Sequence, residues 1–211
     1  MGRMTSFAQL APVCEATILD PGTGAEAAKA FAVEAVDAGV RGVSIPPTLV
    51  GAVSPAFDAG LLVISTSGAP TGLHHTLVKA AEARLSVQFG VGEIEVAPDP
   101  AAVAAGDENA LLAEFVAVRE GITEQVALTV VVDAAAPHLE VLASAAAKAG
   151  ASALKVDARS RAVRAVARAA KSSAGDLAVK ASGRIVSMDE ALSFIDAGAT
   201  RLALGDLNWA R

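Results

Sequence analysis

The chain contains 211 residues with a formal net charge of −6, and 53% of its residues are hydrophobic whereas 19% are charged. This composition excludes an intrinsically disordered chain, and the length suits one domain with a buried core. The negative charge argues against non-specific nucleic-acid binding, and no apolar run approaches the roughly 20 residues that span a bilayer. The start of the chain has no apolar signal core, and the single cysteine, Cys14, has no partner for an internal disulfide. We therefore expect one cytoplasmic domain over residues 1–211, with no membrane or nucleic-acid partner.

Short runs of β-branched and other apolar residues alternate with Ala-rich helical patterns along the chain. Strands are expected at Ala16–Leu19, Gly42–Ile45, Leu61–Ser65, Glu93–Val96, Ala127–Val132, Ala153–Val156, Leu177–Ala181 and Arg201–Leu204. Helices are expected near Glu26–Ala38, Pro47–Ala59, His74–Arg84, Glu108–Glu120, Pro137–Lys148, Ser160–Lys171 and Met188–Ala197.

Several helix ends carry recognisable capping residues. Thr23 with Glu26, and Ser187 with Glu190, fit the capping box in which side chain and backbone satisfy each other's free groups. Asp99 before a proline predicts the start of a further short helix. Glycines after four of the helical patterns suit the left-handed residue that ends a helix.

Eight strands that alternate with helices indicate a parallel sheet, because parallel neighbours need a crossover connection. We expect a compact (β/α)₈ TIM barrel, since the length lies near the lower limit of roughly 200 residues for that fold. Seven residues follow Leu204, so the eighth helix is expected to be incomplete. The segment Ser6–Val13 is expected to form an N-terminal helix that closes the bottom of the barrel.

Two lysines interrupt apolar strands, whereas the others lie in helical patterns where solvent exposure is ordinary. Lys155 and Lys180 belong to consecutive predicted strands, which would bring them close together. Burial and a neighbouring cation both disfavour the ammonium form of a lysine, and the free amine can attack a carbonyl to form a Schiff base. A second interpretation is that each lysine extends to water, or that one pairs with Asp157. The helical lysines are Lys29, Lys79, Lys148 and Lys171.

Carboxylates accompany the two strand lysines. Glu93 and Glu95 flank one residue and therefore point to the same side of the fourth strand, Glu15 precedes the first strand, and Asp133 ends the fifth. An inward glutamate beside lysines could hold them by charge and relay protons. A structural ion pair inside the barrel remains an equally good interpretation of this spacing.

Five ordered motifs resemble the deoxyribose-phosphate aldolase family, whose members are class I aldolases on a (β/α)₈ barrel. The resemblance runs through nearly the whole chain without large gaps. The motifs are EATILDP at 15–21, GVSIPP at 42–47, GEIEV at 92–96, ALKV at 153–156 and VKASG at 179–183.

The resemblance implies roles for individual residues. Lys155 falls on the Schiff-base lysine, Lys180 on the second lysine that activates it, and Glu95 on the position of a catalytic aspartate. Glu15 and Thr17 fall on the substrate-binding first-strand motif. A class I aldolase needs no metal and no cofactor, so none is expected. The implied partners are a small aldehyde or sugar phosphate and, as in many family members, a second copy in a homodimer.

Departures from the family pattern concentrate where it binds phosphate. Both aspartates are glutamates here, and the Thr/Ser-rich segment after the Schiff-base lysine reads Val156-Asp157-Ala158-Arg159. A Gly-Gly turn has become Gly183-Arg184, a late serine turn has become Ala203-Leu204-Gly205-Asp206, and the chain contains no tyrosine. The candidate substrate-binding residues are therefore Glu15, Thr17, Ser182, Gly183, Arg184 and Arg159.

Three functions fit these residues. The leading one is reversible cleavage of 2-deoxy-D-ribose 5-phosphate to glyceraldehyde 3-phosphate and acetaldehyde, with Arg159 and Arg184 as new phosphate ligands. The second keeps the Schiff-base chemistry on a different carbonyl compound that can lack a phosphate. The third is a barrel without turnover that binds a ligand.

Overall fold

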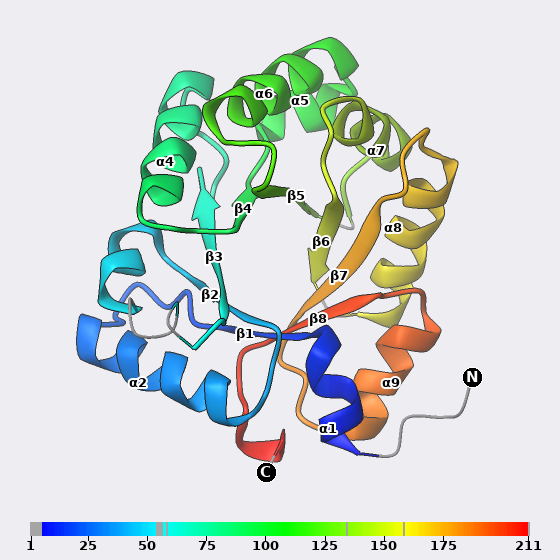
Figure 1. The fold of residues 1–211 in the computed structure, drawn as a ribbon. Coiled ribbons are helices and arrows are strands. Elements are labelled where there is room, and N and C mark those ends of the chain that lie inside the picture. Colours follow the sequence, from blue (N-terminus) through cyan, green and yellow to red (C-terminus); the bar gives the residue numbers. More distant parts are fainter. Residues whose placement is uncertain (1–5, 54–56, 58, 134, 158, 211) are drawn as a thin grey trace.

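The computed structural model describes residues 6–53, 57, 59–133, 135–157 and 159–210, and within these residues it contains a closed barrel of parallel strands. Each strand pairs with the next, and the last pairs with the first (Figure 1). The strands are β1 (Cys14–Thr17), β2 (Gly42–Ile45), β3 (Leu62–Ser67), β4 (Glu93–Val96), β5 (Ala127–Val132), β6 (Ala153–Asp157), β7 (Ala178–Gly183) and β8 (Arg201–Leu204). This arrangement confirms the predicted TIM barrel.

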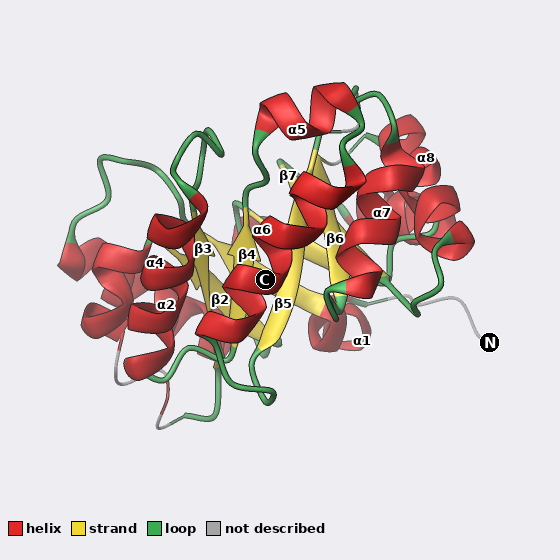
Figure 2. Ribbon diagram, turned by 90° about the horizontal axis from the view of Figure 1, so that it is seen from above, coloured by secondary structure: helices red, strands yellow, loops and turns green. Residues whose placement is uncertain are grey.

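Helices surround the barrel and cover the outer face of its strands (Figure 2). They are α1 (Phe7–Leu10), α2 (Ala25–Asp37), α4 (Thr76–Gln88), α5 (Pro100–Ala105), α6 (Glu108–Gly121), α7 (Leu139–Lys148), α8 (Ser160–Ser172) and α9 (Met188–Asp196). Three shorter 3₁₀ segments are η1 (Ala11–Val13), η2 (Pro47–Val53) and η3 (Asn208–Ala210).

The first strand and the first long helix differ from their predicted starts. β1 begins at Cys14, two residues before the prediction, because Glu15 pairs in register with Gly42 of β2 and Ala203 of β8. The predicted cap at Thr23 is wrong, since α2 begins after Gly24. Asp20 instead organises the turn before α2, where its carboxylate accepts a hydrogen bond from the Gly22 N–H at 2.7 Å.

Two other predicted caps are confirmed. The Ser187 hydroxyl accepts a hydrogen bond from the Glu190 N–H at the start of α9, and the Asp99 carboxylate accepts one from the Ala101 N–H at the start of α5. The helix predicted over Pro47–Ala59 is a 3₁₀ segment up to Val53, and residues 54–56 and 58 of that prediction lie outside the described residues.

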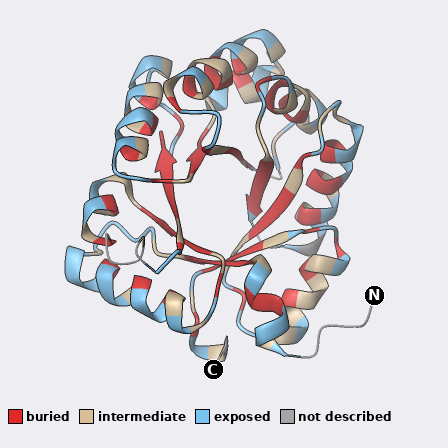
Figure 3. Cartoon of the chain, viewed as in Figure 1, coloured by how far each residue is buried: buried red, intermediate tan, exposed pale blue. Residues whose placement is uncertain are grey.

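Side chains alternate between the two faces of each strand, and this alternation separates two kinds of core. The outward residues are apolar and buried against the helices, as Ile94 and Leu154 are. The inward residues include buried acids and lysines, so the centre of the barrel is ionic. The strands are buried almost along their whole length (Figure 3).

The two ends of the described chain meet beside β1 and β8. Phe7 of α1 and Trp209 of η3 pack edge to face with ring centroids 5.3 Å apart. Among the described residues, only η3 follows β8, which agrees with the predicted incomplete eighth helix. No helix within the described part of the chain has the length and apolarity needed to cross a membrane.

Candidate active site

Two buried lysines lie side by side inside the barrel. Lys155 of β6 pairs in register with Lys180 of β7, as their places in consecutive strands predicted. Lys180 is completely buried, whereas Lys155 retains 6% exposure. The prediction that both extend to solvent is therefore wrong.

Glu95 of β4 bridges the two lysines. Its Oε2 lies 2.6 Å from Lys155 Nζ, and its Oε1 lies 2.9 Å from Lys180 Nζ. The Ser44 hydroxyl donates a further hydrogen bond to Oε2 at 3.1 Å, which holds the carboxylate in place from β2. One carboxylate is thus shared by two amines on its two oxygens.

Lys180 also contacts two other carboxylates. Its Nζ lies 2.7 Å from Glu93 Oε1 and forms an ion pair with Glu15. Thr129 donates to the same Glu93 oxygen at 2.7 Å. Glu93 and Glu95 therefore share a face of β4, as their spacing predicted, and both face Lys180.

The electrostatics of this cluster set the charge of each group. Burial opposes ionisation of Glu95, but Lys155 and Lys180 outweigh it and lower the pKa of Glu95 to about 2. Burial likewise opposes the ammonium form of Lys180, yet the three glutamates raise its pKa above the ordinary value. Lys180 lowers the pKa of Glu93 despite burial, whereas burial dominates at Glu15 and raises its pKa.

Two arginines close the opposite end of the cluster and were not predicted from the sequence. Arg41, just before β2, pairs with Glu15 and lies 3.4 Å from Glu93. Arg201, the first residue of β8, lies 3.6 Å from Glu93. Arg201 opens a predicted strand and pairs in register with Lys180, which was the available signal, whereas Arg41 lies before its strand and offered none.

The three glutamates could suit a metal ion by geometry alone, because each offers an oxygen within 4.8 Å of the others. Lys180 Nζ contacts all three of them, however. An ammonium group therefore occupies the position that a metal ion would take.

The candidate substrate-binding residues of β1 and β7 lie on the mouth side of the cluster. Thr17 follows Glu15 by two residues, and its hydroxyl is buried with no hydrogen-bond partner among the described residues. Ser182 follows Lys180 by two residues, next to Gly183, whose carbonyl accepts hydrogen bonds from Ile185 and Gly205.

The structure does not bring Arg159 and Arg184 to the lysines. Arg159 is exposed and lies 3.1 Å from Asp157, and Arg184 is exposed at the end of β7. The expectation that Asp157 attracts Lys155 is wrong, because Asp157 is solvent-exposed and pairs with Arg159 while Lys155 pairs with Glu95.

Lys79 also departs from its prediction as an exposed helical lysine. It is completely buried in α4, donates to the Ala97 carbonyl at 2.9 Å and pairs with Glu114 of α6. The second oxygen of Glu114 accepts the Asp99 N–H at 3.0 Å. This contact network ties the segment after β4 to two helices.

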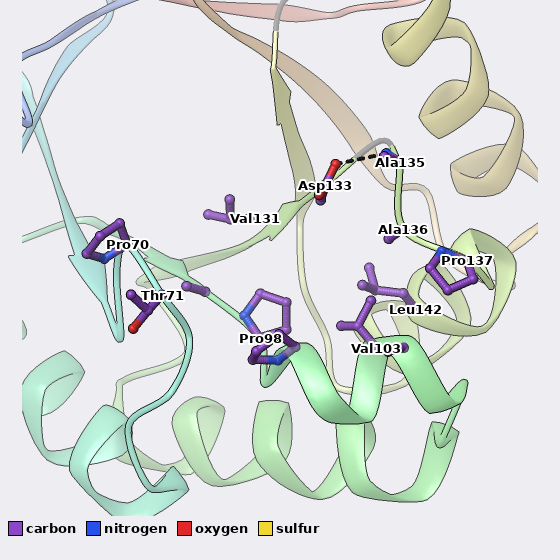
Figure 4. Close-up of a pocket in the computed structure, with 13 residues that line it drawn as sticks. Pro70, Thr71, Pro98, Val103, Val131, Asp133, Ala135, Ala136, Pro137 and Leu142 are labelled. Carbon is purple, nitrogen blue, oxygen red and sulfur yellow. Dashed lines mark hydrogen bonds between the residues drawn. The ribbon is translucent and has the colours of Figure 1, made fainter.

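A cavity of about 410 Å³ opens at the mouth of the barrel, among the segments that follow β3, β4 and β5 (Figure 4). We call it the mouth pocket. Its inner wall includes Val131 of β5, which pairs in register with Lys155. Its other lining residues are mostly apolar and come from the segments after β3, β4 and β5, among them Pro70, Pro98 and Leu142.

Curated relatives extend over almost the whole chain, although no protein-family model matches it. The deoxyribose-phosphate aldolase of Mycolicibacterium paratuberculosis is 40% identical over 209 residues, covering 93% of each chain. That of Corynebacterium glutamicum is 35% identical over 205 residues, covering 93% of this chain and 92% of its own.

Solved structures agree with these relatives. The tetrameric deoxyribose phosphate aldolase from Aeropyrum pernix has a TM-score of 0.86 at 25% identity, covering 96% of this chain and 89% of its own. Together with the buried lysine pair, the identity to the curated relatives fixes the family. The chain belongs to the deoxyribose-phosphate aldolase family and is a lyase of the class I aldolase type.

Proposed function

We propose that this chain performs its aldol reaction through a Schiff base on Lys155. The observation that carries the proposal is the Glu95 bridge, which joins Lys155 to Lys180 through the two oxygens of one buried carboxylate. The bridge gives one amine a proton-transfer partner at 2.6 Å and fixes the other as a permanent cation.

The two lysines differ in their surroundings. Lys180 contacts three carboxylates and is sealed from the pocket, whereas Lys155 has one carboxylate partner and faces the mouth. Loss of one proton from the cluster also balances its formal charges, since four cations face three carboxylates. These cations are Lys155, Lys180, Arg41 and Arg201, and the carboxylates are Glu15, Glu93 and Glu95.

The cleavage direction then has defined steps. The Lys155 amine adds to the carbonyl carbon of the substrate, and loss of water gives an iminium ion. The hydroxyl on the carbon beyond the breaking bond loses its proton, the C–C bond breaks, and its electron pair moves toward the iminium to form an enamine. Protonation of the enamine carbon and hydrolysis by water release acetaldehyde and the free amine. Glu95, a carboxylate at neutral pH, is the proposed acceptor and donor for these protons.

The relatives are named deoxyribose-phosphate aldolases, and the reference reaction that the family resemblance implies is cleavage of 2-deoxy-D-ribose 5-phosphate to glyceraldehyde 3-phosphate and acetaldehyde. Thr17 supports a polar substrate, because its buried hydroxyl lacks a partner at the mouth side of the cluster. A second candidate keeps the same Schiff base and uses a carbonyl compound without phosphate. The ion pair between Arg159 and Asp157 favours this second candidate, because Arg159 is a predicted phosphate ligand and here pairs with a carboxylate.

The first test is borohydride trapping with acetaldehyde, followed by peptide mass spectrometry. We expect the reduced adduct on Lys155 and its loss in Lys155→Ala, with normal labelling in Lys171→Ala as the matched control on the exposed face of α8. An adduct on Lys180 alone would reverse the two roles. The absence of any adduct would leave the barrel as a ligand-binding protein without turnover.

We also propose that the chain forms a homodimer through α4. Four exposed large apolar side chains lie on α4 or directly after it, with Leu77 68% and Phe89 62% exposed; the other two are Val78 and Leu85. Light scattering after size-exclusion chromatography is expected to give twice the 21.0 kDa chain mass. Leu77→Asp in α4 should shift it to the monomer mass, whereas Val33→Asp, an exposed apolar position on α2, should not.

A further inference from the structure

TIM barrels commonly hold a substrate phosphate at the loops after the seventh and eighth strands, near the N-terminus of a short extra helix. In this chain the segment after β8 leads into η3, and the first N–H of η3 is already engaged. The Asp206 carboxylate accepts a hydrogen bond from the Asn208 N–H at 2.8 Å. This N–H is therefore not free to bind a phosphate.

Two further backbone donors of the loops after β7 and β8 are also engaged. The Ile185 N–H donates to the Gly183 carbonyl at 3.1 Å, and the Gly205 N–H donates to the same carbonyl at 3.4 Å. Two loops that would have to turn their N–H groups toward a phosphate instead bond to each other. A phosphate at this position would have to break these contacts.

Charged side chains at the mouth make it acidic. Arg159 is engaged by Asp157, and Arg184 is the other arginine at the carboxyl ends of the described strands. Aspartates follow five of the eight strands and outnumber these arginines. They are Asp20 after β1, Asp99 after β4, Asp133 after β5, Asp157 at the end of β6 and Asp206 after β8.

The mouth pocket offers room for an uncharged group next to Lys155. Val131 forms part of its wall and neighbours Lys155 across the β5–β6 pairing, so a substrate joined to Lys155 can extend into the pocket. Figure 4 shows Pro70, Pro98 and Val103 facing the same space as Val131. Asp133 is the charged residue in this lining.

We propose that the acceptor substrate of this aldolase is an uncharged aldehyde without a phosphate group, and that its tail lies in the mouth pocket. This inference rests on the proposed Schiff base at Lys155. In the synthetic direction the enamine of acetaldehyde on Lys155 attacks the acceptor carbonyl carbon. A C–C bond forms, the carbonyl oxygen takes a proton, and water hydrolyses the iminium to release a 3-hydroxyaldehyde and the free amine.

The direct experiment compares two acceptors that differ only in the phosphate, D-glyceraldehyde and D-glyceraldehyde 3-phosphate, with acetaldehyde as the donor. We expect kcat/KM to be about tenfold or more higher for D-glyceraldehyde, because the aspartates repel the phosphate dianion. Added salt should narrow this ratio, because it screens exposed charges. A preference for the phosphorylated acceptor, equal rates, or addition to neither acceptor would overturn the inference.

Two pairs of variants test the structural basis. Asp133→Asn should raise kcat/KM for D-glyceraldehyde 3-phosphate relative to D-glyceraldehyde about threefold. Asp37→Asn, an equal charge change at the end of α2, should leave this ratio of kcat/KM values unchanged. Ala104→Phe, which places a ring in the mouth pocket, should lower kcat/KM for D-glyceraldehyde about tenfold. Ala101→Phe, on the same helix and outside the lining, is its control.

Borohydride labelling by acetaldehyde separates the inference from the function beneath it. Lys155 should be labelled at the wild-type rate in Ala104→Phe, because acetaldehyde does not need the pocket. Loss of labelling in the wild-type chain would defeat the Schiff-base proposal itself. Normal labelling with no effect of either Asp133→Asn or Ala104→Phe on acceptor choice would defeat only the pocket.

Discussion

At the scale of single residues, the length of the Glu95 side chain decides how the site is connected. Glutamate places its two oxygens far enough from β4 to meet Lys155 on one side and Lys180 on the other. The family pattern has an aspartate here, one methylene shorter. We infer that the glutamate and the neighbouring Ser44 contact are adapted to each other, since Ser44 holds the oxygen that faces Lys155.

Glu95→Asp should therefore impair this chain although it restores the residue of the family. The shorter carboxylate cannot reach both nitrogens, and we expect kcat to fall about 100-fold, because a displacement of about 1 Å in a reacting group has that effect. The measurement is steady-state kinetics with the better of the two acceptors. Wild-type activity in Glu95→Asp would show that the bridge is not required.

The sequence predicted the centre of the site and missed its surroundings. The period-two alternation placed Glu93 and Glu95 on one face of a strand, and the order of the strands placed Lys155 beside Lys180. It could not place Arg41, because the residue lies before a strand and its contact with Glu15 depends on how the barrel closes. Contacts of this kind depend on register between strands distant in the chain.

At the scale of the elements, the Lys79–Glu114 pair joins α4 to α6 beneath the segment that leads from β4 to the mouth pocket. Lys79 holds the Ala97 carbonyl, and Glu114 holds the Asp99 N–H. Helical periodicity assigned Lys79 to solvent because its partners lie on other elements. These contacts fix the position of the segment from Ala97 to Asp99.

Lys79→Met should destabilise the fold strongly, because it leaves the Glu114 charge buried without its partner. We expect the free energy of unfolding to fall by about 3–5 kcal/mol in urea denaturation. Lys148→Met removes the exposed partner of Glu108 and should change the free energy of unfolding far less, because solvent screens an exposed ion pair. Similar losses in the two variants would contradict the buried role of Lys79.

At the scale of the whole molecule, the interior of the barrel is an ionic core enclosed by an apolar one. The barrel could be predicted from eight alternating units, since each apolar strand needs cover on its outer face. The η2 segment could not be predicted in the same way. Its residues have a helical pattern, and this pattern does not distinguish the 3₁₀ segment that Pro47–Val53 form from the helix that was expected.

This ionic core predicts acid sensitivity. The pKa of Glu95 is about 2 in the folded chain and 4.5 for a glutamate in the unfolded chain. The ionised Glu95 therefore contributes fully to the free energy of unfolding above about pH 4.5, and this contribution is lost as the pH falls toward 2. We expect the wild-type chain to lose about 2 kcal/mol more than Glu95→Gln between pH 6 and pH 3.

Urea denaturation across this pH range provides the measurement. Lys180 does not disturb it, because a raised lysine pKa gives a contribution that is complete throughout the acid range. Glu15, whose pKa is raised, contributes with the opposite sign, and this contribution is smaller in Glu95→Gln because the Glu95 charge helps to raise the pKa of Glu15. Parallel curves for wild type and Glu95→Gln would contradict the prediction.

The contact between Phe7 and Trp209 has a spectroscopic consequence. The chain has one tryptophan and no tyrosine, so its intrinsic fluorescence comes from one indole ring where the two ends of the described chain meet. A fluorescence melting curve will therefore report the separation of the ends, whereas circular dichroism will report the barrel. Coincident curves would mean that closure of the ends and formation of the barrel are one cooperative event.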